Sequence, residues 1–167
     1  MSNQTVRLMQ KATRLIAVFL LSLLSVSAHV ERVFKASDGY RAPLFTVGNA
    51  KGSIGLSELE GDYVLVNFWS SADAPSRMAA FDYDRYFSTS ESKIRFLSVN
   101  LDQSPELFRA VVEADSLDAS HQYHATGSSA DELIRDYHLR GNLTSFLVDP
   151  QGRIVATDPT VETLSKV

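Results

Sequence analysis

The chain has 167 residues, no cysteine, and 20 acidic against 16 basic residues, which gives a net charge of −4 at pH 7. This length allows one ordinary domain with a buried core, and the acidic balance disfavours nucleic acid as a partner. The lack of any thiol excludes thiol-disulfide exchange, because that reaction needs one thiolate that attacks and a second thiol that resolves the mixed disulfide.

Residues 1–28 have the pattern of a secretory signal peptide. The basic residues near its start are Arg7, Lys11 and Arg14. They precede an apolar run from Leu15 to Leu24, and small residues follow at 26–28, as they do before a signal-peptidase cleavage site. The run is shorter than the ~18 to 20 apolar residues that span a bilayer, so we expect cleavage before His29 and no stable membrane anchor afterwards. Met9 is an alternative start that would give the basic region a more usual length.

After the signal peptide, apolar runs of strand length alternate with helical patterns, as in an α/β domain. The first pieces are an apolar segment at Ala42–Val47 and a Ser-x-x-Glu pattern at Ser57–Glu60, which predicts a short helical turn whose N-cap is the serine. Tyr63–Trp69 is apolar on both faces, so it predicts a central strand, and a helix is expected from Ala74 to Thr89.

The second half of the chain continues this alternation. Lys93–Leu101 predicts a strand, and the Ser-Pro pair at 104–105 predicts the start of a helix that ends near Ala114. A second capping-box pattern at Ser129–Glu132 predicts a helix that runs on to a glycine stop at Gly141.

The C-terminal part predicts a hairpin, in which Ser145–Val148 and Arg153–Ala156 flank an Asp-Pro-Gln-Gly turn. The connection 116–128 has the weakest pattern, and we expect either a short strand or an insertion there. Residues 160–167 leave room for a shortened last helix.

The segment between the predicted central strand and the following helix reads VLVNFWSSADAPSR over residues 64–77. It resembles the sequence V-L-V-N-F-W-A-S-W-C-G-P-C-R of the thioredoxin-like thiol-disulfide oxidoreductases, or redoxins, of the bacterial envelope. Asp73 stands at the position of the first cysteine and Ser76 at that of the second. The resemblance therefore implies a redox centre that has lost both of its sulfur atoms.

Two further segments extend the resemblance to roughly residues 42–156. Ala42–Val47 is similar to the family's A-P-x-F-x-L opening segment, and YHLRGNLTSFLVDPQGRIV at 137–155 is similar to Y-x-V-x-G-x-P-T-T-F-L-I-D-x-x-G-x-I-V. The resemblance implies a thioredoxin-like α/β fold for residues 29–167. This would be a single domain in which helices flank a central mixed β-sheet, with the N-terminal extension typical of envelope members.

A third departure from the family lies at Leu143, where members have a proline that follows a cis bond. A cis bond before any other residue costs about 2.5 to 4 kcal/mol, so we expect the Asn142–Leu143 bond to be trans and the loop to be reshaped. The proline shapes the substrate groove in the family, and the groove is therefore predicted to differ here.

Asp73 precedes the predicted helix, and Pro75 falls in its first turn. This arrangement favours an N-cap whose carboxylate accepts a backbone N–H, worth about 0.5 to 2 kcal/mol, at the helix end where the family's thiolate is stabilised. The alternative interpretation makes Asp73 a general base that activates Ser76, but no histidine lies nearby in the sequence to assist it. No catalytic residue is therefore predicted.

The surface formed by the motif and by the loop of Leu143 is the candidate binding groove. Its predicted members are Trp69, Asp73, Ala74, Pro75, Ser76, Leu143 and Thr144. Trp69 has two interpretations, either as an exposed groove residue, because the family's tryptophan lies beside the redox centre, or as a packing residue. The helix that follows carries an aromatic face made of Phe81, Tyr83, Tyr86 and Phe87. We expect this face to be mostly core, with part of it exposed for a partner.

His121 and His124 have the H-x-x-H spacing of two metal ligands, and His138 or a processed His29 could add a third. A metal site needs three or four ligands, and the chain has no cysteine to supply one. The favoured interpretation is therefore a polar loop, with no metal or other cofactor bound.

Two classes of function fit these observations, and a fold alone does not choose between them. The first is a redox-inactive, periplasmic or secreted protein of the bacterial envelope that binds a protein or an extended peptide in the degenerate groove. The second is an enzyme of different, metal- or carboxylate-based chemistry on the same scaffold. A redox or antioxidant activity assigned through the family would have no residue to carry it. The first class is the prediction.

Overall fold

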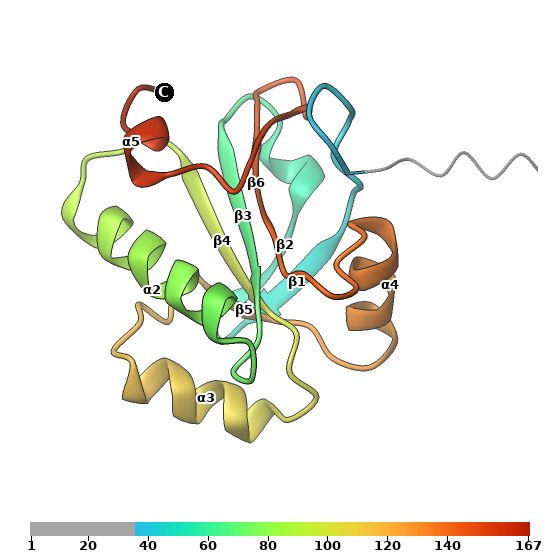
Figure 1. The fold of residues 1–167 in the computed structure, drawn as a ribbon, viewed down its shortest axis with the longest axis vertical. Coiled ribbons are helices and arrows are strands. Elements are labelled where there is room, and N and C mark those ends of the chain that lie inside the picture. The colour runs from blue at the N-terminus through green and yellow to red at the C-terminus, as the bar shows by residue number, and fades with distance from the viewer. Residues whose placement is uncertain (1–35) are drawn as a thin grey trace, which may run out of the picture. The chain divides into compact units, whose positions relative to one another are not determined.

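The computed structural model describes residues 36–167, so the predicted signal peptide and its cleavage site before His29 lie outside the described residues. In the described part, seven strands form one sheet in the order β2-β1-β5-β4-β3-β6-β7 (Figure 1). β3, β4 and β5 run parallel to one another, whereas the remaining neighbours pair antiparallel, so the sheet is mixed. Within residues 36–167, no helix combines the length and apolar character needed to cross a membrane.

Helices cover both faces of this sheet. The strands are β1 (Thr46–Asn49), β2 (Gly52–Gly55), β3 (Val64–Trp69), β4 (Arg95–Asn100), β5 (Gln122–His124), β6 (Ser145–Val148) and β7 (Ile154–Thr157). The helices are the 3-10 turn η1 (Leu56–Leu59), α2 (Ala74–Thr89), α3 (Pro105–Ala114), α4 (Ser128–Asp136) and α5 (Val161–Leu164). Figure 1 shows α2, α3 and α5 on one side of the sheet and α4 on the other. Buried side chains of α2, α3 and α5 belong to the clusters on the first face, and those of α4 and η1 belong to the cluster on the second. The predicted class, a mixed sheet flanked by helices, is confirmed.

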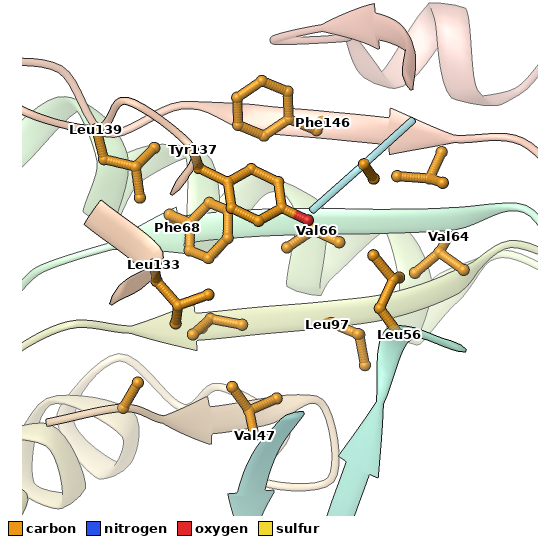
Figure 2. Close-up of a cluster of buried hydrophobic side chains, with 14 of the residues drawn as sticks. Val47, Leu56, Val64, Val66, Phe68, Leu97, Leu133, Tyr137, Leu139 and Phe146 are labelled. Atoms are coloured by element: carbon orange, nitrogen blue, oxygen red, sulfur yellow. The ribbon is translucent and has the colours of Figure 1, made fainter. Parts of the chain in front are cut away.

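The core under α4 is centred on aromatic rings. Figure 2 shows the Tyr137 ring beside Phe68 and Phe146, with ring centroids 4.8 and 5.3 Å away. The Tyr137 hydroxyl donates to the carbonyl oxygen of Pro43 at 2.7 Å, and burial raises the pKa of this tyrosine. The end of α4 is thereby fastened to the segment that precedes β1.

Most of the predicted elements are confirmed, and α2 has the predicted bounds. α3 begins at Pro105, and the Ser104 hydroxyl accepts the backbone N–H of Leu107 at 3.1 Å, as its pattern predicts. β6 and β7 form the expected hairpin. The connection 116–128 contains the short strand β5, which was one of its two predicted forms. The C-terminal residues form the short helix α5, whose Leu164 is buried.

Two predicted caps are wrong. The turn η1 starts after Gly55, whose backbone N–H donates to the Glu58 carboxylate at 2.7 Å, so Ser57 is not the N-cap. α4 starts after Gly127, and the Ser129 hydroxyl donates backward to the carbonyl oxygen of Thr126. α4 also ends at Asp136 rather than at Gly141, because His138 adopts a left-handed backbone conformation with φ of 54°.

A row of polar side chains crosses the sheet beneath α2. Ser145, Asn67, Ser98 and Gln122 are register neighbours on β6, β3, β4 and β5, and each is at most 2% exposed. The Ser145 hydroxyl donates to Asn67 Oδ1 at 2.9 Å, and Gln122 Nε2 donates to the Asp84 carboxylate of α2 at 3.1 Å. Three atoms of this polar row have no hydrogen-bond partner, namely Asn67 Nδ2, Ser98 Oγ and Gln122 Oε1.

The polar row separates two apolar clusters under the same helix. One cluster contains Leu65, Tyr83, Ile94, Phe96, Leu147 and Leu164. The other contains Trp69, Ala80, Val111 and Leu117 and lies at the end of the sheet where β3 and β4 finish. α2 is therefore anchored at two places, with Ala80 in one cluster and Tyr83 in the other.

Candidate functional site

The degenerate motif lies at one edge of the sheet, where the parallel strands β3 and β4 end. β3 finishes at Trp69, and α2 begins five residues later at Ala74, directly after Asp73. On the other side of β3, the backbone N–H of Phe68 donates to the carbonyl oxygen of Thr144 at 3.4 Å. The pairing of β3 with β6 therefore brings the loop of Leu143 and Thr144 to the same edge as the motif.

Asp73 is the N-cap of α2. Its backbone is extended, and its carboxylate accepts the backbone N–H of Ser76 at 2.9 Å. This satisfies one of the free N–H groups at the start of the helix and places a negative charge where the helix dipole favours it. The carboxylate thus has a structural partner at the position where the resembling family has its first cysteine.

Ser76 is buried and has both of its hydrogen-bonding functions in use. Its hydroxyl donates to the carbonyl oxygen of Asp73 at 3.1 Å and accepts the backbone N–H of Ser70 at 3.3 Å. Only 3% of the residue is exposed. A hydroxyl held in this way is not presented to a substrate, which argues against Ser76 as a nucleophile.

Asp102 organises the loop before α2, and the sequence analysis missed it. It is the second residue after the end of β4, and it is 8% exposed. Its carboxylate accepts hydrogen bonds from the hydroxyl of Ser70, from the backbone and hydroxyl of Ser71, and from the Asn100 amide. Polar residues within two positions of the ends of two neighbouring parallel strands are the signal that could have found this contact, because the carboxyl ends of such strands meet at one edge of the sheet.

The hydrogen bonds on Asp102 also set its acidity. Desolvation raises the pKa of this carboxyl, but hydrogen bonds from Ser71, Asn100 and Ser70 outweigh it and hold the pKa below its ordinary value. A carboxylate with a lowered pKa is a weak base, so it is poorly suited to activate either serine hydroxyl. The arrangement fixes the loop in place rather than preparing a nucleophile.

Trp69 is buried, so its assignment to the groove is corrected. Its exposed fraction is 0%, and it packs with Ala80, Val111 and Leu117, with the Phe108 ring 6.2 Å away. The last residue of β3 points under α2 and α3, and these helices cover the indole completely. The packing interpretation of Trp69 is therefore the one that holds.

The loop on the far side of β3 is partly buried. Leu143 packs against the core under α4, and Thr144 shares weak hydrogen bonds with Asn142 at 3.3 and 3.4 Å. No peptide bond within residues 36–167 is cis, so the Asn142–Leu143 bond is trans, as expected. Leu143 thus contributes its side chain to the interior and little of it to a groove.

The two candidate metal ligands have separate partners. His124 Nε2 lies 2.7 Å from the carbonyl oxygen of Asp102, and its ring stacks on Phe108 at 4.9 Å. His121 Nδ1 lies 4.0 Å from the Asp118 carboxylate. Among the described residues, no group of three or more His, Cys, Asp or Glu side chains is placed to hold a metal ion. His138 lies at the end of α4 and is exposed.

A shallow hollow, here called the α2 hollow, lies beside the motif on the outer side of α2. Its lining residues are Ser71, Ala72, Ala74, Arg77, Met78, Phe81 and Asp115. Met78 is 67% exposed and Phe81 42% exposed, whereas Tyr83 on the same helix is buried. Phe81 is thus the exposed member of the predicted aromatic face, and Pro75 is also exposed next to the hollow.

One ion pair borders the α2 hollow. The Arg77 guanidinium donates two hydrogen bonds to the Asp115 carboxylate, at 2.7 and 2.6 Å. These hydrogen bonds raise the pKa of Arg77 and lower that of Asp115. The sequence analysis had no signal for this pair, because α2 and the end of α3 approach each other only in the folded chain.

Comparison with known proteins places this geometry in a family. A model of the AhpC/TSA family matches residues 39–157. A thioredoxin-like protein from Parabacteroides distasonis ATCC 8503 is 28% identical, with a TM-score of 0.66 over 79% of this chain and 94% of that one. The thioredoxin domain of a thiol-disulfide oxidoreductase from Bacteroides vulgatus is 26% identical, with a TM-score of 0.67 over 78% and 94% of the two chains. A search of curated proteins found no match.

A third solved structure agrees with these two. A thiol:disulfide interchange protein from Bacteroides sp. is 26% identical, with a TM-score of 0.66 over 78% of this chain and 86% of that one. These likenesses confirm the thioredoxin-like fold implied by the sequence motifs. The family match spans well over half of the chain and includes both degenerate motif positions. The chain therefore belongs to the AhpC/TSA family, as a member that has no cysteine.

Proposed function

We propose that this chain is a redox-inactive AhpC/TSA protein that binds another polypeptide at the surface beside its degenerate motif. One observation carries the proposal: at both motif positions the side chain is engaged within the protein, Asp73 as the N-cap of α2 and Ser76 through hydrogen bonds with the backbone of Asp73 and Ser70. The similar proteins named as thiol-disulfide oxidoreductases act through chemistry for which this chain has no sulfur nucleophile. The fold is kept while the reactive groups are replaced, which supports a binding role.

The proposed location is the periplasm or the outside of the cell. The support is the signal-peptide pattern of residues 1–28. Expression in a bacterium should give a periplasmic form whose N-terminal sequence starts at His29. Membrane-bound protein with residues 1–28 intact would favour a retained anchor instead.

An enzyme with carboxylate-based chemistry has less support. The buried carboxylate nearest the motif, Asp102, has a lowered pKa and is used to hold the loop. The nearby hydroxyl of Ser76 is buried and already hydrogen-bonded. Neither group is poised as a base or a nucleophile.

Redox inactivity is tested with insulin reduction and disulfide isomerisation, using protein prepared free of host thioredoxin. The natural chain should show no turnover above buffer. The matched positive control restores the family's residues with Asp73→Cys and Ser76→Cys, and then adds Leu143→Pro. We expect the two cysteines to form a disulfide, and exchange with protein substrates to become efficient only in the triple variant. Turnover by the natural chain would overturn the proposed function.

Binding at the motif surface is tested by site-specific cross-linking in cells that export the protein. A photoreactive residue at Ala74, which is exposed at the start of α2, should capture a discrete partner. The control position is Gln151, exposed in the β6–β7 turn at the far end of the sheet. Equal capture from both positions would show that the motif surface is not the binding site.

A further inference from the structure

The α2 hollow offers no free polar side chain to a ligand. Arg77 and Asp115 are bound to each other through two short hydrogen bonds. The remaining polar residue of the lining, Ser71, donates its hydroxyl to the Asp102 carboxylate. What the hollow leaves available is therefore apolar.

The apolar part of the α2 hollow is continuous along the helix. Ala74, Met78 and Phe81 follow one another at spacings of four and three, so they share one face of α2. The apolar lining combines the small side chains of Ala72 and Ala74 with the larger side chains of Met78 and Phe81. Methionine adapts its shape to different apolar partners, which suits a surface that binds more than one sequence.

We infer that the α2 hollow binds an uncharged, apolar segment of another polypeptide chain, which places one large apolar side chain against Met78 and Phe81. This inference rests on the proposed function and names the chemistry of its partner. A charged segment is disfavoured, because it would either break the Arg77–Asp115 pair or leave its own charge without a partner. An uncharged segment leaves that pair intact and still covers the exposed apolar side chains.

The charge of the whole chain argues against two other occupants. The net charge of −4 opposes close approach of a second copy and of an anionic lipid surface. A partner segment without charge meets neither form of repulsion. Self-association and membrane binding are therefore outcomes that would contradict the inference.

The test is a titration of ¹⁵N-labelled protein with a synthetic peptide of uncharged residues that contains one leucine and one phenylalanine. Amide shifts should change at residues 71–81 and at Asp115, and hardly at all in the β6–β7 hairpin. Met78→Glu and Phe81→Glu should each weaken binding about tenfold or more, as expected for central apolar contacts. Ala72→Trp should also block binding by filling the hollow, without removing either apolar contact.

Leu107→Glu is the matched control, because Leu107 is 46% exposed on α3 and does not line the hollow. It should leave the peptide affinity unchanged. Thermal unfolding of every variant checks that the fold is kept. Equal binding of a peptide in which lysines replace the leucine and phenylalanine would overturn the inference.

Three further outcomes contradict it. Concentration-dependent dimerisation that Met78→Glu abolishes would identify a second copy as the occupant. Binding to vesicles of anionic phospholipid that the same variant abolishes would identify a membrane. If no peptide binds while the redox assays stay negative and Ala74 still cross-links a partner, the apolar-segment inference fails and the proposed function stands.

Discussion

At the residue scale, Asp73 uses the same property of a helix start that stabilises a thiolate. Free N–H groups and the helix dipole favour negative charge at the start of a helix, and here the Asp73 carboxylate occupies that place. This contact was predictable from the sequence, because an N-cap depends on residues only three positions apart. The contacts of Asp102 were not, because Ser70 and Ser71 lie about 30 positions away along the chain and become neighbours only when β3 and β4 pair.

The cap predicts a specific order of stabilities. Asp73→Ala should lower the free energy of unfolding by about 1 kcal/mol, because the Ser76 N–H loses its acceptor. Asp73→Asn should recover most of the loss, since its amide oxygen still accepts that N–H. Urea unfolding of the three proteins measures both differences. Unchanged or increased stability in Asp73→Ala is the pattern expected of a catalytic carboxylate, and it would refute the capping role.

Asp102 should make the stability of the protein sensitive to acid. The pKa of Asp102 in the folded protein lies below its ordinary value. Its ionised form therefore adds to the free energy of unfolding in full above the pKa of an unfolded aspartate, about 3.9. This contribution is lost as the pH falls through the lower folded-state pKa. Asp102→Asn should therefore destabilise the protein by about 1 to 3 kcal/mol at neutral pH, because the charge is lost and one of the two oxygens that accept hydrogen bonds becomes an NH₂ group that cannot accept them. The difference from the natural chain should shrink when unfolding is followed at progressively lower pH. A difference that is constant with pH would contradict this role.

At the scale of elements, local patterns located helices and strands better than they located helix ends. α2 was predicted with its full bounds, because Asp73 and Pro75 mark its start. The caps proposed at Ser57 and Ser129 were wrong, because each helix starts earlier, with a glycine two residues before the serine as its N-cap. β5 has too few residues to show a period of its own and forms by pairing with β4.

The polar row predicts opposite effects for two similar substitutions. Ser98→Ala should raise the free energy of unfolding by about 1 kcal/mol, because it removes a buried hydroxyl that has no partner. Ser145→Ala is the matched control and should lower the free energy of unfolding by about 1 kcal/mol, because the side-chain oxygen Oδ1 of Asn67 loses a donor. Chemical unfolding of the two variants gives the comparison. Destabilisation by Ser98→Ala would show that its hydroxyl has a partner in solution.

At the scale of the whole molecule, the chain keeps the architecture of its family without the family's reactive residues. The mixed sheet flanked by helices was predicted from the resemblance, and the C-terminal hairpin from its turn, but the order of the seven strands comes from the structure. The exposed residues around the motif were harder to predict. Trp69 was a candidate for exposure but is covered by two helices, while Met78, given no role in the sequence analysis, is 67% exposed. Which side of a residue is covered depends on how helices pack, and the sequence alone does not show it.

The division of the core beneath α2 has a consequence for motion. Because the polar row separates the two apolar clusters, we expect the motif end of α2, together with α3, to open while the other cluster stays closed. We expect native-state hydrogen exchange to show two groups of amides. The amides of α3 and residues 77–81 should exchange through an opening of lower free energy than the amides of residues 83–88. A single opening shared by all of α2 would contradict this. A ligand bound at the motif end would then slow hydrogen exchange in α3 and leave residues 83–88 of α2 unaffected. Binding at this surface would therefore be detected as a change in local opening, even where the structure itself stays the same.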